Sequence, residues 1–210
     1  MNSKIAVSLN KLTKNYGSTR GIFEVTFDVY AGEVMGFLGP NGAGKTTAIR
    51  TLLGLIKATS GAATILGKNA LIPNVELRRK IGYLPGIAAT YDRYTALGYL
   101  DFIARMRGLE LEAEIRKLAR RLDLDINEHI HDLSKGNRQK VSVIQAFMHS
   151  PEVLFLDEPT SGLDPLVQRE FEKILDETRD RGAAIVLSSH VLSEVEHLAN
   201  RIAIIDRGEI

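Results

Sequence analysis

The chain has 210 residues, 44% of them hydrophobic and 25% charged, with a formal net charge of +1. This length and balance are typical of a soluble globular protein with one large domain or two small lobes, and the near-zero charge gives no basic field for a nucleic-acid partner. The sequence has no cysteine, which excludes disulfides and thiolate metal sites, and no apolar run approaches the ~18 residues of a membrane span, so we expect a cytoplasmic chain.

A phosphate-binding pattern follows the first strands. Residues 23–29 alternate apolar and polar side chains, which predicts a half-buried antiparallel strand, and residues 34–38 are a continuously apolar strand. The next residues fit Gly-x-x-x-x-Gly-Lys-[Ser/Thr], in which backbone N–H groups surround a phosphate at a helix start; an ordinary glycine-rich turn is the alternative. Lys45 adds charge for the β- and γ-phosphates, Thr46 is placed for Mg²⁺, and residues 48–56 read as the helix that the pattern opens. The loop comprises Gly39, Pro40, Asn41, Gly42, Ala43, Gly44, Lys45, Thr46 and Thr47.

Residues 95–149 carry apolar side chains at helical spacing and no strand-like run. We interpret them as a helical lobe inserted into an α/β core formed by residues 1–94 and 150–210, within a single domain. The apolar residues 153–156 then lead to two acids. Asp157 is placed to bind Mg²⁺, and Glu158 to act as a general base or to orient the water that attacks the γ-phosphate. Alone, such a pair of acids more often caps a turn.

The last part of the chain continues the alternation of strands and helices. Asp164 is a natural N-cap for a helix over residues 165–179, and the apolar run 183–187 leads to His190. Strand C-termini line the ligand crevice of a parallel sheet, so His190 is within reach of the γ-phosphate, although a single histidine is more often structural. Residues 202–210 read as a strand, a turn and the start of another strand, and we expect the domain to continue beyond them. The alternation predicts an α/β fold.

Residues 133–140 read Leu-Ser-Lys-Gly-Asn-Arg-Gln-Lys and resemble the signature motif of the ATP-binding cassette (ABC) ATPases. The resemblance spans nearly the whole chain. The matching positions, in order, are Tyr16, residues 39–47, Tyr83-Leu84-Pro85, residues 133–140, Asp157, Glu158, residues 161–164 and His190. It implies a P-loop NTPase core with a mainly parallel sheet, an N-terminal antiparallel β subdomain and an inserted helical subdomain.

The resemblance also implies a composite site for ATP and Mg²⁺. In this family two subunits pack head to tail, and each ATP lies between the loop of one and the signature of the other, so Ser134 and Gly136 would contact nucleotide held by a partner. Ser134 is also a good helix N-cap, and both roles are compatible. Tyr16 would stack on adenine; a strand-end aromatic packed on the sheet is the alternative. Lys45, Glu158 and His190 would be the catalytic residues, and Thr46 and Asp157 the metal ligands.

Two departures from the family pattern point to one branch of it. Lys135 and Asn137 replace a glycine and a glutamine of the usual signature, and Gly86 stands where a glutamine commonly reaches toward Mg²⁺. The Leu-Ser-Lys-Gly and Pro-Gly sequences resemble those of drug, antibiotic and polysaccharide exporters. The resemblance therefore implies export.

The implied function is that of an ATP-hydrolysing subunit of a membrane transporter. Separate membrane-spanning permease subunits would dock on residues 86–94 and the helical lobe, which would place the chain on the inner face of the cell membrane. The second ATP-binding subunit could be an identical or a different chain. The alternative is a soluble ABC ATPase that acts on the ribosome or on DNA; such relatives usually carry two cassettes or a long coiled coil, and this sequence has neither.

Overall fold

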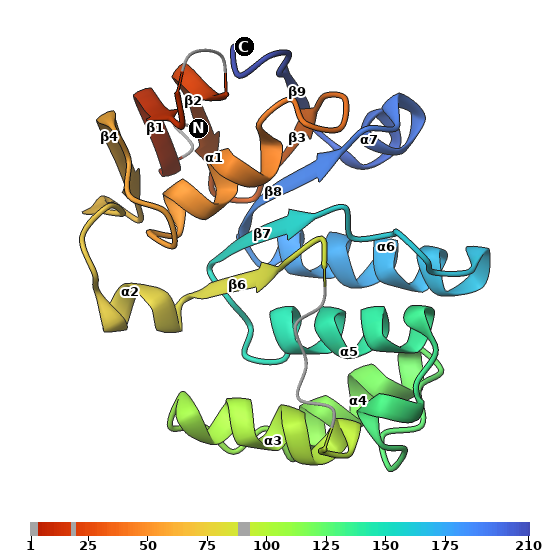
Figure 1. The fold of residues 1–210 in the computed structure, drawn as a ribbon. Helices are drawn as coiled ribbons and strands as arrows, with labels where there is room; N and C mark the ends of the chain where they lie inside the picture. Colours follow the sequence, from red (N-terminus) through yellow and green to blue (C-terminus); the bar gives the residue numbers. More distant parts are fainter. Residues whose placement is uncertain (1–3, 18–19, 88–92) are drawn as a thin grey trace.

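Two β-sheets and the helices around them build the described part of the chain, residues 4–17, 20–87 and 93–210 of a computed structural model (Figure 1). The strands are β1 (Ile5–Asn15), β2 (Gly21–Tyr30), β3 (Val34–Leu38), β4 (Ser60–Ile65), β5 (Lys68–Asn69), β6 (Ile81–Leu84), β7 (Val153–Asp157), β8 (Ala184–Ser189) and β9 (Arg201–Ile204). The helices are α1 (Lys45–Leu52), α2 (Val75–Arg79), α3 (Ala96–Met106), α4 (Glu112–Arg121), the 3-10 helix η1 (Ile130–Asp132), α5 (Lys135–Phe147), α6 (Pro165–Asp180) and α7 (Leu192–Leu198).

The first sheet is antiparallel, with the strand order β2-β1-β4-β5, and the second is parallel, with the order β6-β7-β8-β3-β9. The three central parallel strands, β3, β7 and β8, are mostly apolar and buried because both faces of their sheet are covered, whereas β9 at the sheet edge is largely exposed. Phe155 of β7 packs on one face with residues of α1 and the antiparallel sheet, whereas Leu154 and Leu156 pack on the other face with residues of α3 to α7. The predicted α/β fold with a mainly parallel sheet and an antiparallel part is confirmed.

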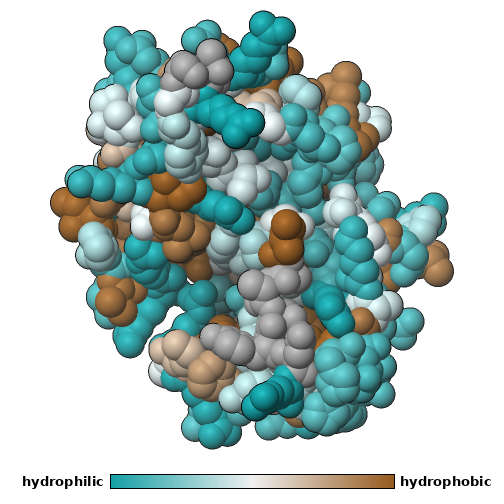
Figure 2. All heavy atoms as spheres, viewed as in Figure 1, coloured by the Kyte–Doolittle hydropathy of each residue, from teal (hydrophilic) through white to brown (hydrophobic). Residues whose placement is uncertain are grey.

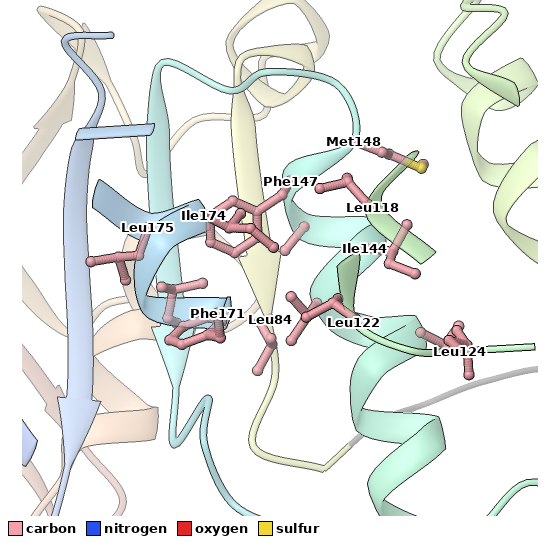
Figure 3. Packing of buried hydrophobic residues seen from close by; sticks show 14 of the residues in the cluster. Leu84, Leu118, Leu122, Leu124, Ile144, Phe147, Met148, Phe171, Ile174 and Leu175 are labelled. Carbon is pink, nitrogen blue, oxygen red and sulfur yellow. The ribbon is translucent and has the colours of Figure 1, made fainter. Parts of the chain in front are cut away.

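The helix-covered face holds a cluster of large apolar side chains (Figure 3). Phe147 of α5 and Phe171 of α6 meet edge to face, with ring centroids 6.0 Å apart. Burying side chains of this size is worth roughly 1.5–3 kcal/mol each, so this cluster is a main source of the stability of the fold. It also fixes α5 and α6 against the strands that end at the candidate site.

The segment between β6 and β7 is helical. Its residues 95–149, all of them described, contain α3, α4, η1 and α5 and no strand. α5 lies so close to β6 that a Cβ at Gly82 would clash with the carbonyl of Ala146. α5 therefore packs directly on the parallel sheet, and the division of the chain into a core and a helical lobe stays a prediction. Within the described part, no helix is long and apolar enough to cross a membrane.

One element boundary differs from the predicted one. The helix expected over residues 48–56 ends at Leu52, because Gly54 adopts a left-handed φ of 63° that a continuing helix cannot accommodate. After β9, Asp206 and Glu209 form an isolated antiparallel bridge across a turn, and the strand expected to begin there stays a prediction.

The order of the parallel strands decides where the candidate site lies. β8 lies between β7 and β3, and the register pairs Leu38 with Ser189 and Asp157 with Ser188. The C-terminal ends of β3, β7 and β8 therefore lie side by side, and the loops that follow them meet at one edge of the sheet. This edge is where ligands bind in open parallel α/β sheets.

Candidate functional site

The loop between β3 and α1 depends on its glycines. Gly42 and Gly44 have positive φ angles of 85° and 114°, which favour glycine, and a Cβ at Gly44 would come within 2.8 Å of the Ile22 side chain. Among the described residues no side chain caps the start of α1, and its first turn has no acidic residue. The free N–H groups and the positive end of the helix dipole are therefore left for an anion.

Lys45, the first residue of α1, is buried beneath this loop. Its Nζ donates hydrogen bonds to the carbonyl oxygens of Gly39, at 2.5 Å, and Pro40, at 3.2 Å. The same ammonium lies 3.4 Å from Oε1 of Glu158. The lysine thus places a positive charge between the phosphate-type loop and the acid that follows β7.

Thr46 and Asp157 form the second pair of the site. Thr46 Oγ1 donates to Asp157 Oδ2 at 2.7 Å, and Ser188 Oγ donates to Asp157 Oδ1 at 2.5 Å, with Asp157 only 2% exposed. A hydroxyl and one carboxylate suit Mg²⁺, which takes few protein ligands beside phosphate oxygens and water. The described residues contain no cluster of three or more acidic, histidine or cysteine side chains that would hold a metal unaided. The pair therefore fits a metal that arrives with a nucleotide.

Glu158 and His190 form the third pair. His190 Nδ1 lies 2.8 Å from Glu158 Oε2, and the Glu158 N–H donates to the Ser188 carbonyl, which holds Glu158 at a strained φ of 52°. The other carboxylate oxygen, Oε1, is buried and makes no hydrogen bond among the described residues, although the Lys45 ammonium lies 3.4 Å from it. A buried acceptor that lacks a hydrogen bond is costly in a folded protein, so Oε1 can still accept one from a water molecule or ligand.

These groups surround one cleft of about 1100 Å³. The predicted site residues that line it are Tyr16, Pro40, Asn41, Gly42, Gly44, Lys45, Thr46, Thr47, Asp157 and Glu158. Tyr16 is 54% exposed at the cleft, so its ring is accessible to a ligand, and Lys14 Nζ lies over the ring, 4.9 Å from its centre. Gly39, Ala43 and His190 are not among the described residues that line the cleft, and His190 reaches the site through its contact with Glu158.

Gly86 also lines the cleft, next to Asp157. A Cβ at this position would lie 3.4 Å from Asp157 Oδ2. A side chain at this position would therefore begin in van der Waals contact with the Asp157 carboxylate, and the glycine leaves that space free. Residues 88–92 of the predicted docking segment 86–94 lie outside the described residues.

The predicted signature residues lie elsewhere. Ser134 caps α5, its Oγ accepting a hydrogen bond from Asn137 N at 3.1 Å, and neither Ser134 nor Gly136 is among the described residues that line the cleft. A Cβ at Gly136 would lie 2.7 Å from the carbonyl of Gly162, so this glycine lets α5 approach the loop after β7. The predicted cap of α6 is present too, because Asp164 Oδ1 accepts from the N–H groups of that helix.

Sequence reasoning missed several polar residues around the site. Ser188 binds Asp157, and Ser189, Thr160 and Glu194 join neighbouring loops by hydrogen bonds. The only sequence signal for the two serines was their place at the C-terminal end of a buried strand. Nothing in the sequence pairs Glu194 with Thr160, because that contact depends on how α7 packs.

Comparison with known proteins supports this assembly of features. Residues 22–161 match the family described as ABC transporter. The bacitracin transport ATP-binding protein BcrA of Bacillus licheniformis is 37% identical over 207 residues, which cover 97% of this chain and 68% of BcrA. An uncharacterised ABC transporter ATP-binding protein of Synechocystis is 40% identical over 189 residues, 87% of this chain and 53% of that protein.

A solved structure described as the ATP-binding subunit of an ABC transporter has a similar fold. Its TM-score is 0.89 at 31% identity, and the match covers 98% of this chain and 88% of that one. The chain thus spans about half of the Synechocystis relative and about two thirds of BcrA. With the family match over residues 22–161 and relatives aligned along most of its length, the chain belongs to the ABC transporter family of ATP-binding proteins.

Proposed function

We propose that this chain binds and hydrolyses ATP and thereby drives a membrane transporter. The observation that carries the proposal is the convergence of three parts on one cleft: the uncapped start of α1, the Thr46–Asp157 pair and the Glu158–His190 pair. Phosphoryl transfer needs an anion site, a pair of metal ligands and an acid that orients water, because the enzyme catalyses it mainly by positioning and electrostatic stabilisation.

Nucleotide binding would use groups that are already in place. The N–H groups of the loop and Lys45 would hold the β- and γ-phosphates, and the exposed ring of Tyr16 would stack on adenine. Thr46 and Asp157 would hold Mg²⁺, which supplies positive charge against the phosphate oxygens when it is bound. The two residues already share a hydrogen bond, so a metal would find both oxygens on one side of the cleft.

Hydrolysis would depend on Glu158. Its Oε1, which makes no hydrogen bond among the described residues, would accept one from water, whose oxygen forms a bond to the γ-phosphorus while the bond to the β–γ bridging oxygen breaks. The water proton passes to the carboxylate and then to the phosphate product. His190, 2.8 Å from the other carboxylate oxygen, would keep Glu158 oriented, and Lys45 would offset the charge that develops on the phosphate oxygens.

A second subunit would complete the site. Ser134 and Gly136 lie at the start of α5, away from the cleft of their own chain, and a head-to-tail partner would bring this helix start to the bound nucleotide. ATP would then hold two subunits together, and its hydrolysis would release them.

A permease subunit would receive the motion that this association and release of the two subunits produces. A small apolar hollow of about 150 Å³ lies beside the end of α1 and α2, where Figure 2 shows hydrophobic residues gathered on the left of the face in view. Leu55 and Ile72 line it and are exposed, and Arg107 of the helical segment forms part of its wall. We propose that an apolar segment of the permease docks there, with the chain on the inner face of the membrane. BcrA is named for bacitracin transport, which supports export of a drug-like cargo.

The proposal is tested by isolating the chain from detergent-solubilised cells and measuring ATP hydrolysis. A membrane protein should copurify, and the complex should hydrolyse ATP faster than the chain alone. The Lys45→Met variant, purified in the same way, should show no ATP hydrolysis above background. Copurification with ribosomes and no membrane protein would overturn the transport assignment, and a wild-type complex without ATPase activity would overturn the enzymatic one.

A further inference from the structure

Glu194, in the first turn of α7, joins the loops that carry the candidate catalytic pair. Its Oε2 accepts a hydrogen bond from Ser189 Oγ at 2.5 Å, and its Oε1 accepts one from Thr160 Oγ1. Ser189 ends β8, directly before His190, and Thr160 lies in the loop after β7, two positions beyond Glu158. One carboxylate therefore bridges the loop of the histidine to the loop of the acid.

This bridge is one of three side-chain links between the ends of β7 and β8. Ser188 Oγ binds Asp157 Oδ1 at 2.5 Å, and His190 Nδ1 lies 2.8 Å from Glu158 Oε2. Ser189, between them in sequence, makes the third link through the helix carboxylate. The first two links include the candidate metal ligand and the candidate base themselves, so of these three side-chain links only the third lies outside the groups that carry the chemistry.

The helix that carries the bridge has a fixed position. Val195 is fully buried, and a Cβ at Gly36 of β3 would clash with its side chain, so α7 lies directly on the parallel sheet. Ser189 is fully buried as well, and its Oγ also accepts a hydrogen bond from the N–H of Val191. A carboxylate on such a support restrains the groups that it binds.

We propose that Glu194 is a positioning residue for ATP hydrolysis. It holds the His190 loop and the segment after Glu158 in one relative geometry and so keeps the water-orienting pair together. The inference rests on the proposed function, and it assigns Glu194 no contact with the nucleotide, since the carboxylate is not among the described residues that line the cleft. Its loss should therefore affect turnover and leave ATP binding intact.

The first test compares Glu194→Ala with Glu196→Ala, an exposed acid on the same helix. Because misplacing reacting groups by about 1 Å can cost on the order of a hundredfold in rate, we expect Glu194→Ala to lower kcat on the order of tenfold. Its KM for ATP should stay near the wild-type value, because Lys45 and the loop are untouched. Glu196→Ala should match wild type in both constants.

The second test separates positioning from folding. Glu194→Gln should recover most of the lost kcat, since a carboxamide can accept from one hydroxyl and donate to the other, and hydroxyl oxygens accept as well as donate. Combining Thr160→Val with Ser189→Ala should reproduce the loss. In a His190→Ala background, Glu194→Ala should lower kcat little further. The position of the His190 loop relative to Glu158 no longer matters once the imidazole is gone.

The outcomes distinguish this inference from the proposed function. A wild-type complex without ATPase activity would overturn the proposed function. An active wild type with Glu194→Ala equal to Glu196→Ala, or a higher KM at unchanged kcat, would overturn the positioning role. A full additional loss in the His190→Ala background would also overturn it. If Glu194→Ala does not fold, wild-type kcat in the Thr160→Val/Ser189→Ala double variant would decide against it.

Discussion

Helices α1 and α5 both begin at a lysine next to a glycine, yet the two helix starts differ in what they leave free. α1 has no side-chain cap among the described residues, and its Lys45 is buried against the loop. α5 is capped by Ser134, and its Lys135 is exposed. The first start faces a deep cleft of its own chain, whereas the second faces outward beside Gly162.

The difference shows how one chain can carry a complete and an incomplete anion site. At α1, free N–H groups, a buried ammonium and a metal-type pair lie together, so a phosphate would meet all of them at once. At α5, Ser134 Oγ already satisfies one of the free N–H groups, and no buried ammonium or metal-type pair among the described residues is placed with it at a cleft. The start of α1 should therefore matter for ATP binding by a single chain. The start of α5 should matter only where a partner subunit supplies the bound nucleotide.

Exchanging the two lysines for methionine should give the largest contrast. Lys45→Met removes the ammonium from the phosphates, and we expect kcat/KM for ATP to fall at least about a thousandfold, with ATP binding by the single chain lost as well. Lys135→Met should leave binding by the single chain unchanged. Binding is measured by titration with a fluorescent ATP analogue, and equal losses in the two variants would remove the distinction between the two helix starts.

Glu158→Gln should separate binding from hydrolysis. The amide keeps the size of the side chain but cannot take a proton, so we expect hydrolysis to fall at least about a hundredfold while ATP still binds. With hydrolysis blocked, ATP should hold two subunits together, which size-exclusion chromatography with and without ATP would show. Hydrolysis at the wild-type rate would refute the role of Glu158 as base, and a monomer with bound ATP would refute the composite site.

Ser134→Ala should then weaken the second helix start alone. Removing a serine N-cap costs about 1 kcal/mol of folding stability, and Thr95→Ala, at the cap of α3, is the matched control with the same expected cost. In the Glu158→Gln background, only Ser134→Ala should also raise the ATP concentration needed to form the dimer. If both cap variants dimerise alike, the start of α5 does not contact the nucleotide.

The smallest effect concerns a third helix start, at α6. The N–H groups of Val167 and Leu166 bind the Asp164 carboxylate and lower its pKa below the ordinary 3.8. Its ionised form therefore stabilises the fold above pH 3.8, and this contribution is lost as the pH falls through the lowered pKa. Asp164→Asn should be slightly less stable than wild type in urea at pH 7, and the difference should shrink as the pH falls below 3.8 and the Asp164 carboxylate takes up a proton. A difference that stays constant as the pH is lowered would show that the charge is not its cause.

The site was predictable from the sequence wherever its residues act through their neighbours in the chain. The glycines of the loop set the backbone at Gly42 and Gly44, and Lys45 begins the helix that the pattern requires. Asp157 and Glu158 follow an apolar run, so their position at the end of a buried strand was also predictable. The caps at Ser134 and Asp164 are local hydrogen bonds of the same kind.

The fold was predictable to the level of strand type and order of elements, and less so at its boundaries. Alternating and continuous apolar runs predicted the antiparallel β2 and the buried parallel strands, because each sheet face dictates its own pattern. The end of α1 at Leu52 was missed, since Gly54 ends the helix inside a segment that still reads as apolar and helical.

The sequence by itself determined the phosphate loop, the acids after β7 and the helix caps, because short-range geometry and the alternation of side chains encode them. Only the tertiary structure decided which distant groups meet. Ser188 reaches Asp157 because β7 and β8 pair in that register, and Glu194 joins Thr160 to Ser189 because α7 packs on the sheet beside both. Such contacts depend on strand order and helix packing, which are set by the whole core and leave no local pattern in the chain.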